Sequence, residues 1–310
     1  MIQPKIIDYL VKKTGIQQKS LIEKDLLLHR ILFELLLDKN FDTNYIFKGG
    51  TCLMKCHLGY YRFSEDLDFT WLNQKALHNK SEKQIRSILS SEITFLASLV
   101  ERVAMKIGLD FKADKRDIKY LQFGGSNASV TCKLWYHSSQ TNEKGFIKIQ
   151  VNYRENLLYP VVKRKAKSII DLALAKDFSF VFPEESEFLL KDVNLYAYDI
   201  REILVEKIRA ILTRKAVKVR DFVDVFLIEQ TEKLKVEKFE EQIIAKVLYA
   251  LRFEKYKVNF KNKLEHKPVV ELGEEIYLLL RPLGKDFPAF LTRLETFIDR
   301  LLEKLSKEIN

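Results

Sequence analysis

The sequence predicts an α+β protein in which a mixed sheet is followed by a helical region. Three segments rich in β-branched and aromatic residues lie between residues 118 and 153, and two of them alternate apolar with polar side chains. Such alternation is typical of strands that bury one face. Beyond about residue 165, apolar residues recur at the three- and four-residue spacing of helices. We therefore expect an α+β part over residues 1–165 and a mainly helical part over residues 166–310.

Local signals mark the first elements of the chain. Ser20 and Glu23 have the spacing of a capping box, which predicts a helix from about residue 21 to 38. The short segment 44–48 is aromatic and β-branched and therefore predicts a strand.

Glycines bound the next predicted helix. Gly49-Gly50 predicts a turn, 51–58 a short helix, and Gly59 a left-handed cap at its end. Segment 67–71 then predicts a second strand. The first part ends with a long amphipathic helix and three strands, of which the last two form a hairpin, at 81–107, 118–123, 129–137 and 146–153.

The second part contains three clear helix signals. Asp199 and Glu202 can cap a helix that runs to about Lys215, and another helix is expected from about 220 to 230. A stripe of apolar residues predicts a final helix over 287–309, through Leu291, Leu294, Phe297, Ile298, Leu301, Leu302 and Leu305.

Two carboxylates on the second predicted strand indicate a metal site. Asp66 and Asp68 are two residues apart, so both point to one face, roughly 6.5–7 Å apart along the strand. Two carboxylates that close repel each other unless a cation lies between them. Mg²⁺ suits the position because it takes oxygen ligands and substrate phosphates together. We therefore expect Asp66 and Asp68 to bind Mg²⁺ or Mn²⁺.

The glycine pair indicates a phosphate site beside that metal. Without side chains, Gly49 and Gly50 let backbone N–H groups approach a phosphate, and the following helix N-terminus favours negative charge. Thr51 adds a hydroxyl at the helix start, and Arg62 and Ser64 precede the acids. Each feature alone is common in turns and exposed strand ends, but their order favours binding of an NTP and nucleotidyl transfer.

These residues also carry a resemblance to a known family. Residues 47–51, Phe-Lys-Gly-Gly-Thr, and residues 62–68, Arg-Phe-Ser-Glu-Asp-Leu-Asp, resemble the signature of AbiEii/AbiGii-type nucleotidyltransferases. Those proteins are toxins of bacterial toxin–antitoxin and phage-abortive-infection systems with a DNA polymerase β-like catalytic fold. Segment 23–25, Glu202 and segments 206–210 and 220–224 are similar to further motifs of that family. The resemblance runs from about residue 20 to 230.

By that resemblance, Lys207 and Asp221 complete the catalytic residues. On one continuous helix, fourteen residues would place them ~21 Å apart along the axis, which is too far for one site. Segment 216–219 must therefore break the helix so that the second part can complete the active-site cleft. Lys207 would then bind a triphosphate oxygen or activate a reacting oxygen, and Asp221 would orient Lys207 or take part in proton transfer. An ordinary charged helix face is the alternative.

A third carboxylate, usual in polymerase β-like enzymes, is missing from the expected strand. There Lys148, Gln150 and Asn152 share the polar face, and Glu155 lies just beyond. With two carboxylates, a second metal ion would be held weakly. Either one metal ion suffices, with Lys207 or Asp221 replacing part of the second ion's role, or the site binds nucleotide without turnover.

Composition bears on partners and location. A net charge of +10 favours a polyanionic partner such as RNA, although a solvated surface explains it equally well. Three cysteines indicate a reducing compartment, and the most apolar segment is interrupted by charges and too short for a membrane span. We expect a cytoplasmic, NTP-dependent toxin that modifies RNA, with the tRNA 3′ end as the first candidate and a cognate antitoxin as a partner. The alternatives are a catalytically silent nucleotide- or RNA-binding protein and a transferase that acts on protein hydroxyls.

Overall fold

The computed structural model describes residues 2–125, 128–266 and 277–309. Its contacts divide the chain into two compact units. The first contains the residues up to Glu155 together with Val161–Tyr198, and the second contains Asn156–Pro160 together with the chain from Asp199 onward. The division therefore differs from the boundary predicted at residue 165, because the segment up to Tyr198 returns to the sheet of the first unit.

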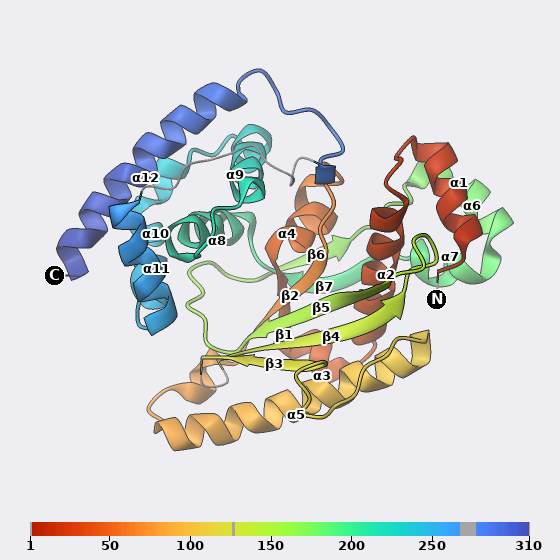
Figure 1. Cartoon of the computed structure of the whole chain (residues 1–310), viewed down its shortest axis with the longest axis horizontal. Helices are drawn as coiled ribbons and strands as arrows, with labels where there is room; N and C mark the ends of the chain where they lie inside the picture. Colours follow the sequence, from red (N-terminus) through yellow and green to blue (C-terminus); the bar gives the residue numbers. More distant parts are fainter. Residues whose placement is uncertain (1, 126–127, 267–276, 310) are drawn as a thin grey trace. The chain divides into compact units, whose positions relative to one another are not determined.

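A mixed sheet of seven strands forms the centre of the first unit (Figure 1). Its order is β3-β4-β5-β2-β1-β7-β6. The β2–β5 and β1–β7 pairs are parallel, and the other neighbours are antiparallel. The strands are β1 (Tyr45–Lys48), β2 (Asp66–Trp71), β3 (Leu121–Gly124), β4 (Ser129–His137), β5 (Lys144–Asn152), β6 (Val162–Ala166) and β7 (Val193–Ala197).

Helices accompany this sheet within the first unit. They are α1 (Pro4–Thr14), α2 (Lys19–Leu35), α3 (Lys39–Asn44), α4 (Gly49–Cys52), α5 (Glu82–Ile107), α6 (Leu172–Val181) and α7 (Pro183–Leu189). A π-helical turn, η1 (Leu53–Leu58), continues α4, and a 3₁₀ turn, η2 (Gln74–Leu77), follows β2. The α5 helix begins at a capping box between Ser81 and Gln84, which satisfies backbone groups at its N-terminus.

The second unit is helical. It contains α8 (Ile200–Thr213), α9 (Val219–Glu232), α10 (Glu240–Ala250), α11 (Glu254–Glu265) and α12 (Phe287–Ile309), with a 3₁₀ turn, η3 (Val236–Phe239), before α10. Asp199 caps α8 by accepting a hydrogen bond from the Arg201 N–H. Six of the seven predicted stripe residues of α12 are buried, from Leu294 to Leu305. The α+β class, the mixed sheet and the C-terminal helical region are thus confirmed.

Four local predictions were wrong. Gly49 and Gly50 do not precede the helix as a turn but are the first two residues of α4. The α2 helix begins at Lys19 with Gln18 as its cap, because Glu23 instead accepts hydrogen bonds from Ser138 and Ser139 after β4. Gly59 has a positive φ, but its ψ of −172° is extended, so it is not a left-handed cap. The third strand begins only at Leu121, after a turn.

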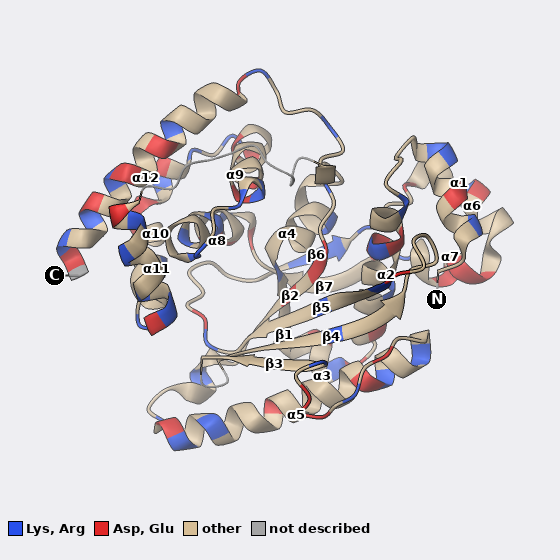
Figure 2. Cartoon of the chain, in the orientation of Figure 1, with Lys and Arg blue, Asp and Glu red and all other residues tan. Residues whose placement is uncertain are grey.

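The distribution of charge and the hydropathy of the helices bear on the expected partners and location. Figure 2 shows Lys and Arg interspersed with Asp and Glu along most helices, so much of the positive excess is dispersed. Among the described residues, no helix combines the length and the apolarity that a membrane crossing requires.

Candidate active site

Asp66 and Asp68 lie on one face of β2, as predicted. Leu67 and Phe69, which alternate with them, are buried on the opposite face and fix the strand in the core. The Asp66 side chain keeps 24% of its surface exposed. The two carboxylates are therefore held on a rigid element while at least one of them remains accessible to solvent.

Gly49 brings the backbone against the second carboxylate. In the β1–β2 pair, Lys48 lies directly opposite Asp68, so the next residue along the chain passes beside the Asp68 side chain. A Cβ at position 49 would overlap Asp68 Oδ2, and the residue has φ +79°. Both the close approach and the positive φ require glycine here.

Gly50 lies against the Arg62 side chain. A Cβ at this position would overlap the Arg62 guanidinium, and it would lie 3.3 Å from Ser64 Oγ. The Arg62 side chain is 1% exposed, and its Nη1 donates to the Phe63 carbonyl at 2.8 Å. Arg62 therefore places a buried positive charge directly behind the glycine pair.

Thr51 is buried in this arrangement. Its hydroxyl lies 2.5 Å from the Asp66 carbonyl oxygen and 2.7 Å from Ser64 Oγ. Because a carbonyl only accepts, Thr51 donates to Asp66, and the Ser64 hydroxyl can then donate to Thr51. With the Thr51 side chain fully buried, its hydroxyl ties the helix start to β2, and its backbone N–H is the group suited to a phosphate.

The strand beside the acids supplies no third carboxylate. In the parallel β2–β5 pair, Asp66 lies opposite Lys148 and Asp68 opposite Gln150. The Lys148 ammonium is 3.8 Å from Asp66 Oδ1. Among the described residues, no group of three or more His, Cys, Asp or Glu side chains is placed to hold a metal. Two carboxylates still fit one Mg²⁺, because that ion commonly takes one or two carboxylates and completes its shell with phosphates and water.

Glu155, the nearest acidic alternative, is engaged elsewhere. Its Oε2 lies 3.1 Å from the Lys48 ammonium and 3.3 Å from Asn152 Nδ2. Lys48 and Glu155 are both largely buried, so this ion pair joins the end of β1 to the chain just after β5. Sequence analysis assigned Lys48 no role, although its position immediately before the glycine pair was a usable signal.

Lys207 and Asp221 form an ion pair in the second unit. The helix break predicted between them is present, since α8 ends at Thr213 and α9 begins at Val219. The Lys207 ammonium lies 2.8 Å from Asp221 Oδ1 and 2.6 Å from Asp224 Oδ2. Asp224 follows Asp221 by three residues, one helical turn, and this spacing could have identified it from the sequence.

Asp221 is held in its ionised form. Its Oδ2 also lies 2.6 Å from Arg214 Nη1. Burial opposes ionisation of Asp221, but the charges of Lys207 and Arg214 outweigh it and lower the pKa of this carboxyl below its ordinary value. A carboxyl with a lowered pKa is a weak base, so Asp221 is better suited to positioning Lys207 than to accepting a proton.

A second buried ion pair supports α8 from the other side. The Lys246 ammonium lies 2.6 Å from Glu202 Oε1 and 3.0 Å from Glu206 Oε1. Glu202 also accepts hydrogen bonds from the backbone N–H groups of Leu158 and Tyr159. Burial is the main reason that the pKa of Glu202 is raised. Glu202, predicted as part of a cap, thus binds the segment 156–160 to the second unit.

The predicted site residues fall into two groups. The first unit brings together seven of them around the glycine pair, namely Gly49, Gly50, Thr51, Arg62, Ser64, Asp66 and Asp68. The second unit brings together Lys207 and Asp221. Sequence reasoning missed the contacts of Lys148, Asp224 and Arg214 with these residues.

Comparison with known proteins gives a family match over most of the chain. The sequence model of the nucleotidyl transferase AbiEii toxin, of type IV toxin–antitoxin systems, matches residues 30–307. The crystal structure of JHP933 from Helicobacter pylori is similar at 16% identity, with 95% of this chain and 98% of that chain covered and a TM-score of 0.42. A second H. pylori structure, of a candidate nucleotidyltransferase, has 18% identity, 93% and 98% coverage and a TM-score of 0.43. No curated protein matches the chain.

Proposed function

The chain belongs to the AbiEii family of nucleotidyltransferase toxins, and we propose that it transfers a nucleoside monophosphate from an NTP to an RNA acceptor. The observation that carries this proposal is the packing of Asp68 against Gly49. It brings a carboxylate face and a side-chain-free helix start to one end of the sheet. Among RNA acceptors, the 3′ end of tRNA is our first candidate, and a cognate antitoxin is the expected protein partner.

The helix start is the proposed site for the triphosphate. The first N–H groups of a helix have no acceptor within the helix, and among the residues of α4 these groups belong to Gly49, Gly50 and Thr51. The absence of side chains at 49 and 50 lets phosphate oxygens approach these groups, and the helix dipole favours the negative charge. The buried Arg62 guanidinium behind Gly50 adds a positive charge on the same side.

Asp66 and Asp68 are the residues that would hold Mg²⁺ or Mn²⁺. The bound ion would supply neutralisation of phosphate charge and activation of the attacking hydroxyl. The chain's own contribution is to fix the two carboxylates on β2, so that little reorganisation is needed when substrate binds. Gln150 stands opposite Asp68 in place of a third carboxylate, and the Lys148 ammonium lies 3.8 Å from Asp66. We therefore propose that the site uses one metal ion and not two.

The proposed reaction is in-line displacement at the α-phosphorus. A 3′ hydroxyl of RNA forms the new P–O bond and gives its proton to solvent water, and the bond from the α-phosphorus to the oxygen that bridges to the β-phosphate breaks to release pyrophosphate. Positioning and charge neutralisation account for most catalysis in such transfers. We assign Lys207 to nucleotide binding, with Asp221 and Asp224 as the residues that orient its ammonium.

A nucleotide-binding protein without turnover is the second candidate. It is favoured by one observation, the presence of Lys148 and Gln150 opposite the two acids. A lysine there lowers the affinity for a second cation, and transfer that needs two ions would then fail.

Labelling with α-³²P NTPs separates these candidates. Each NTP is incubated with the protein, Mg²⁺ and total RNA, and the products are treated with RNase or protease. The proposal expects label in an RNA band that is lost in the Asp66→Asn, Asp68→Asn double variant. The matched control is Asp8→Asn, Asp177→Asn, which removes two exposed carboxylates from surface ion pairs. Protease-sensitive label would identify a protein acceptor instead, and NTP binding without any label would favour the silent binding protein.

A further inference from the structure

The edge strand β6 concentrates positive charge. Its three central residues, Lys163, Arg164 and Lys165, are all exposed, and among the described strands it pairs only with β7, at the end of the sheet. Figure 2 shows β6 coloured almost throughout as Lys and Arg. Edge strands often carry lysines because these discourage pairing with other chains. The composition alone therefore has an ordinary explanation, and the surroundings of the strand must decide whether it binds a ligand.

The register of β6 and β7 shows which of their side chains share a face of the sheet. Lys163 lies opposite Tyr196, and Lys165 lies opposite Asn194. Directly opposed residues share a face, and so do residues two apart. These four side chains therefore form one surface, while Arg164 and its buried partner Leu195 lie on the other.

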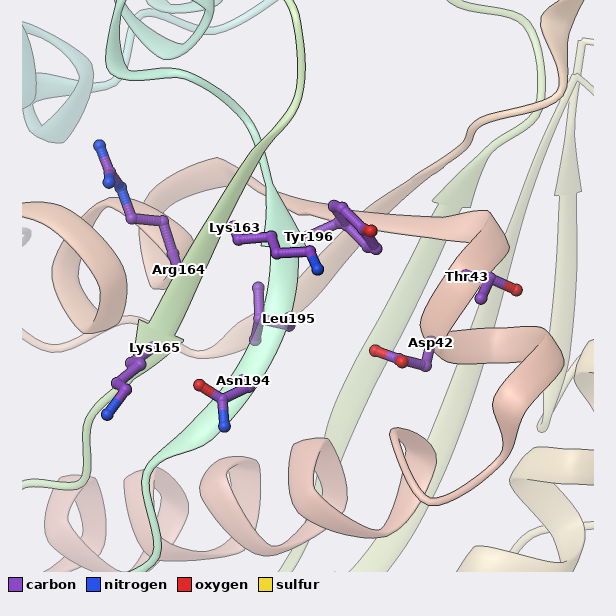
Figure 3. Close-up of a pocket in the computed structure, with 8 residues that line it drawn as sticks. All are labelled: Asp42, Thr43, Lys163, Arg164, Lys165, Asn194, Leu195 and Tyr196. Atoms are coloured by element: carbon purple, nitrogen blue, oxygen red, sulfur yellow. The ribbon is translucent and has the colours of Figure 1, made fainter.

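That surface forms one wall of an open pocket. Asp42 and Thr43 of α3 form the opposite wall, and the hollow has a volume of about 690 Å³. This volume lies within the usual range for ligand sites. In Figure 3, the Tyr196 ring lies next to Lys163, and the Asp42 carboxylate points from α3 toward the two strands.

The charges of the pocket are mostly uncompensated. The Lys163 ammonium lies 5.4 Å from the centre of the Tyr196 ring. Lys165 is 3.6 Å from Asp192, but both side chains are exposed, so this ion pair is weak. Within the described part of the chain, Lys163 and Asp42 have no ion-pair partner. Besides Thr43, Arg164 and Leu195, the lining of the pocket thus combines two lysines, one aromatic ring, an amide and a single carboxylate.

We infer that this pocket binds an unpaired nucleotide segment of the RNA acceptor, away from the transfer chemistry. A base stacks on Tyr196, while Lys163 and Lys165 contact neighbouring phosphates. Asp42 and Asn194 accept hydrogen bonds from amino groups on the base edge, as such side chains do in base recognition. The inference rests on the proposed RNA acceptor and adds to it a docking site on the first unit.

An acidic peptide added as a strand to the free edge of β6 is the competing occupant. Such a strand would use the backbone of β6 and would not require the Tyr196 ring. The Asp42 carboxylate would also repel it, whereas base amino groups would satisfy that carboxylate. The pocket chemistry therefore favours RNA.

Binding of RNA can be measured without any transfer reaction. Fluorescence anisotropy with a labelled single-stranded RNA of mixed sequence, in EDTA and without NTP, follows binding by the full chain. The test variants are Lys163→Ala, Lys165→Ala together, and Tyr196→Leu alone. The control is Lys83→Ala, Lys176→Ala, which removes two exposed lysines elsewhere on the same unit. All of these side chains are at least partly exposed, and circular dichroism checks that each variant is folded.

The inference expects specific changes. The double lysine variant should bind at least about tenfold more weakly, and its slope of log K against log salt should be shallower by about 1.4, as for two lost phosphate contacts. Tyr196→Leu should weaken binding at least about fivefold with an unchanged slope. The control should match the wild type.

Other outcomes overturn the inference. Equal affinities for test and control variants would show that the pocket does not bind RNA. A second contrary result is that the test variants bind RNA as tightly as the control but lose binding of a labelled poly-glutamate peptide. That result would identify an acidic protein segment as the occupant. Pocket-dependent RNA binding without NTP-dependent labelling would sustain this inference while the transferase proposal failed, so the two can be judged separately.

Discussion

The carboxylates in the two groups of candidate catalytic residues differ in burial and in ion pairing. In the second unit, Asp221 and Asp224 are buried, with side-chain exposures of 2% and 0%, and both contact Lys207. In the first unit, the Asp66 side chain is 24% exposed, and its nearest ammonium, Lys148, is 3.8 Å away. The carboxylates of the second unit are neutralised within the chain, whereas the Asp66 carboxylate is partly exposed and only weakly paired with Lys148.

This difference separates charges that neutralise one another inside the protein from a charge that remains available to a cation from solution. A buried carboxylate with two cationic partners contributes to stability, and its loss leaves charges unpaired in a low-dielectric interior. A carboxylate held on a strand but only loosely paired gives the protein little stability and remains available to a cation from solution. Variants in the two groups should therefore differ in whether activity or stability is lost.

The largest effect is expected at the carboxylates of β2. Asp66→Asn or Asp68→Asn should lower the rate of nucleotide transfer by about a thousandfold or more, because the shape is kept while the charge that holds the metal ion is lost. Cells that express either variant should no longer show growth arrest, because the transfer activity is lost. The free energy of unfolding, measured with urea, should change by less than about 1 kcal/mol for Asp66→Asn. A large loss of stability in that variant would remove the contrast between the two groups.

The next effect is expected at Lys207, and it should appear in stability. Lys207→Met leaves Asp221 and Asp224 without this shared cation, which should lower the free energy of unfolding by about 3–5 kcal/mol. Hydrogen exchange should accelerate in α8 and α9. Lys19→Met is the control, because Lys19 and Asp8 form an exposed ion pair expected to contribute less than about 1 kcal/mol. Similar losses in both variants would contradict the assignment of a stabilising role to the buried group.

Glycine substitution can separate backbone strain from the contact with Asp68. Gly49 and Gly15 both have positive φ, +79° and +74°, but only at Gly49 would a Cβ overlap another residue. Each Gly→Ala change should cost about 1–2 kcal/mol in unfolding free energy from backbone strain. Gly49→Ala should in addition displace Asp68 and weaken Mg²⁺-dependent NTP binding, measured by calorimetry. Unchanged NTP binding in Gly49→Ala would mean that this glycine is structural only.

The residues around the glycine pair could be predicted from the sequence because their signals are local. A strand, two glycines, a helix and an alternating Asp-x-Asp strand lie within 24 residues, 45–68, and each is recognisable by itself. The break between α8 and α9 was also predictable, since a continuous helix would have separated Lys207 from Asp221 by ~21 Å.

The remaining features depend on partners distant in the chain. Glu23 has the spacing of a capping residue, but its contacts are Ser138 and Ser139, more than a hundred residues away. The β6 strand, Val-Lys-Arg-Lys-Ala, lacks the apolar alternation of a half-buried strand and becomes one only by pairing with β7. Such pairing is set by tertiary contacts, which local periodicity does not report.

A final comparison separates the two units by their response to acid. Burial, with the nearby charge of Lys55, lowers the pKa of His29 in the first unit to about 3. The unfolded chain takes up this proton near pH 6.5, so the unfolding free energy should fall as the pH drops from about 6.5 toward 3, by at most about 1.4 kcal/mol per pH unit.

Asp221 in the second unit should respond only at lower pH. Because its folded pKa lies below the ordinary value of 3.8, its stabilising contribution is complete above that pH and is lost only on further acidification. The two tryptophans, Trp71 and Trp135, both belong to the first unit, so their fluorescence in urea titrations at pH 7, 6, 5 and 4.5 reports that unit alone. His29→Gln should flatten this pH dependence, whereas Asp221→Asn should leave its slope unchanged over the same range. An equal slope in wild type and His29→Gln would place the acid-sensitive group elsewhere in the unit.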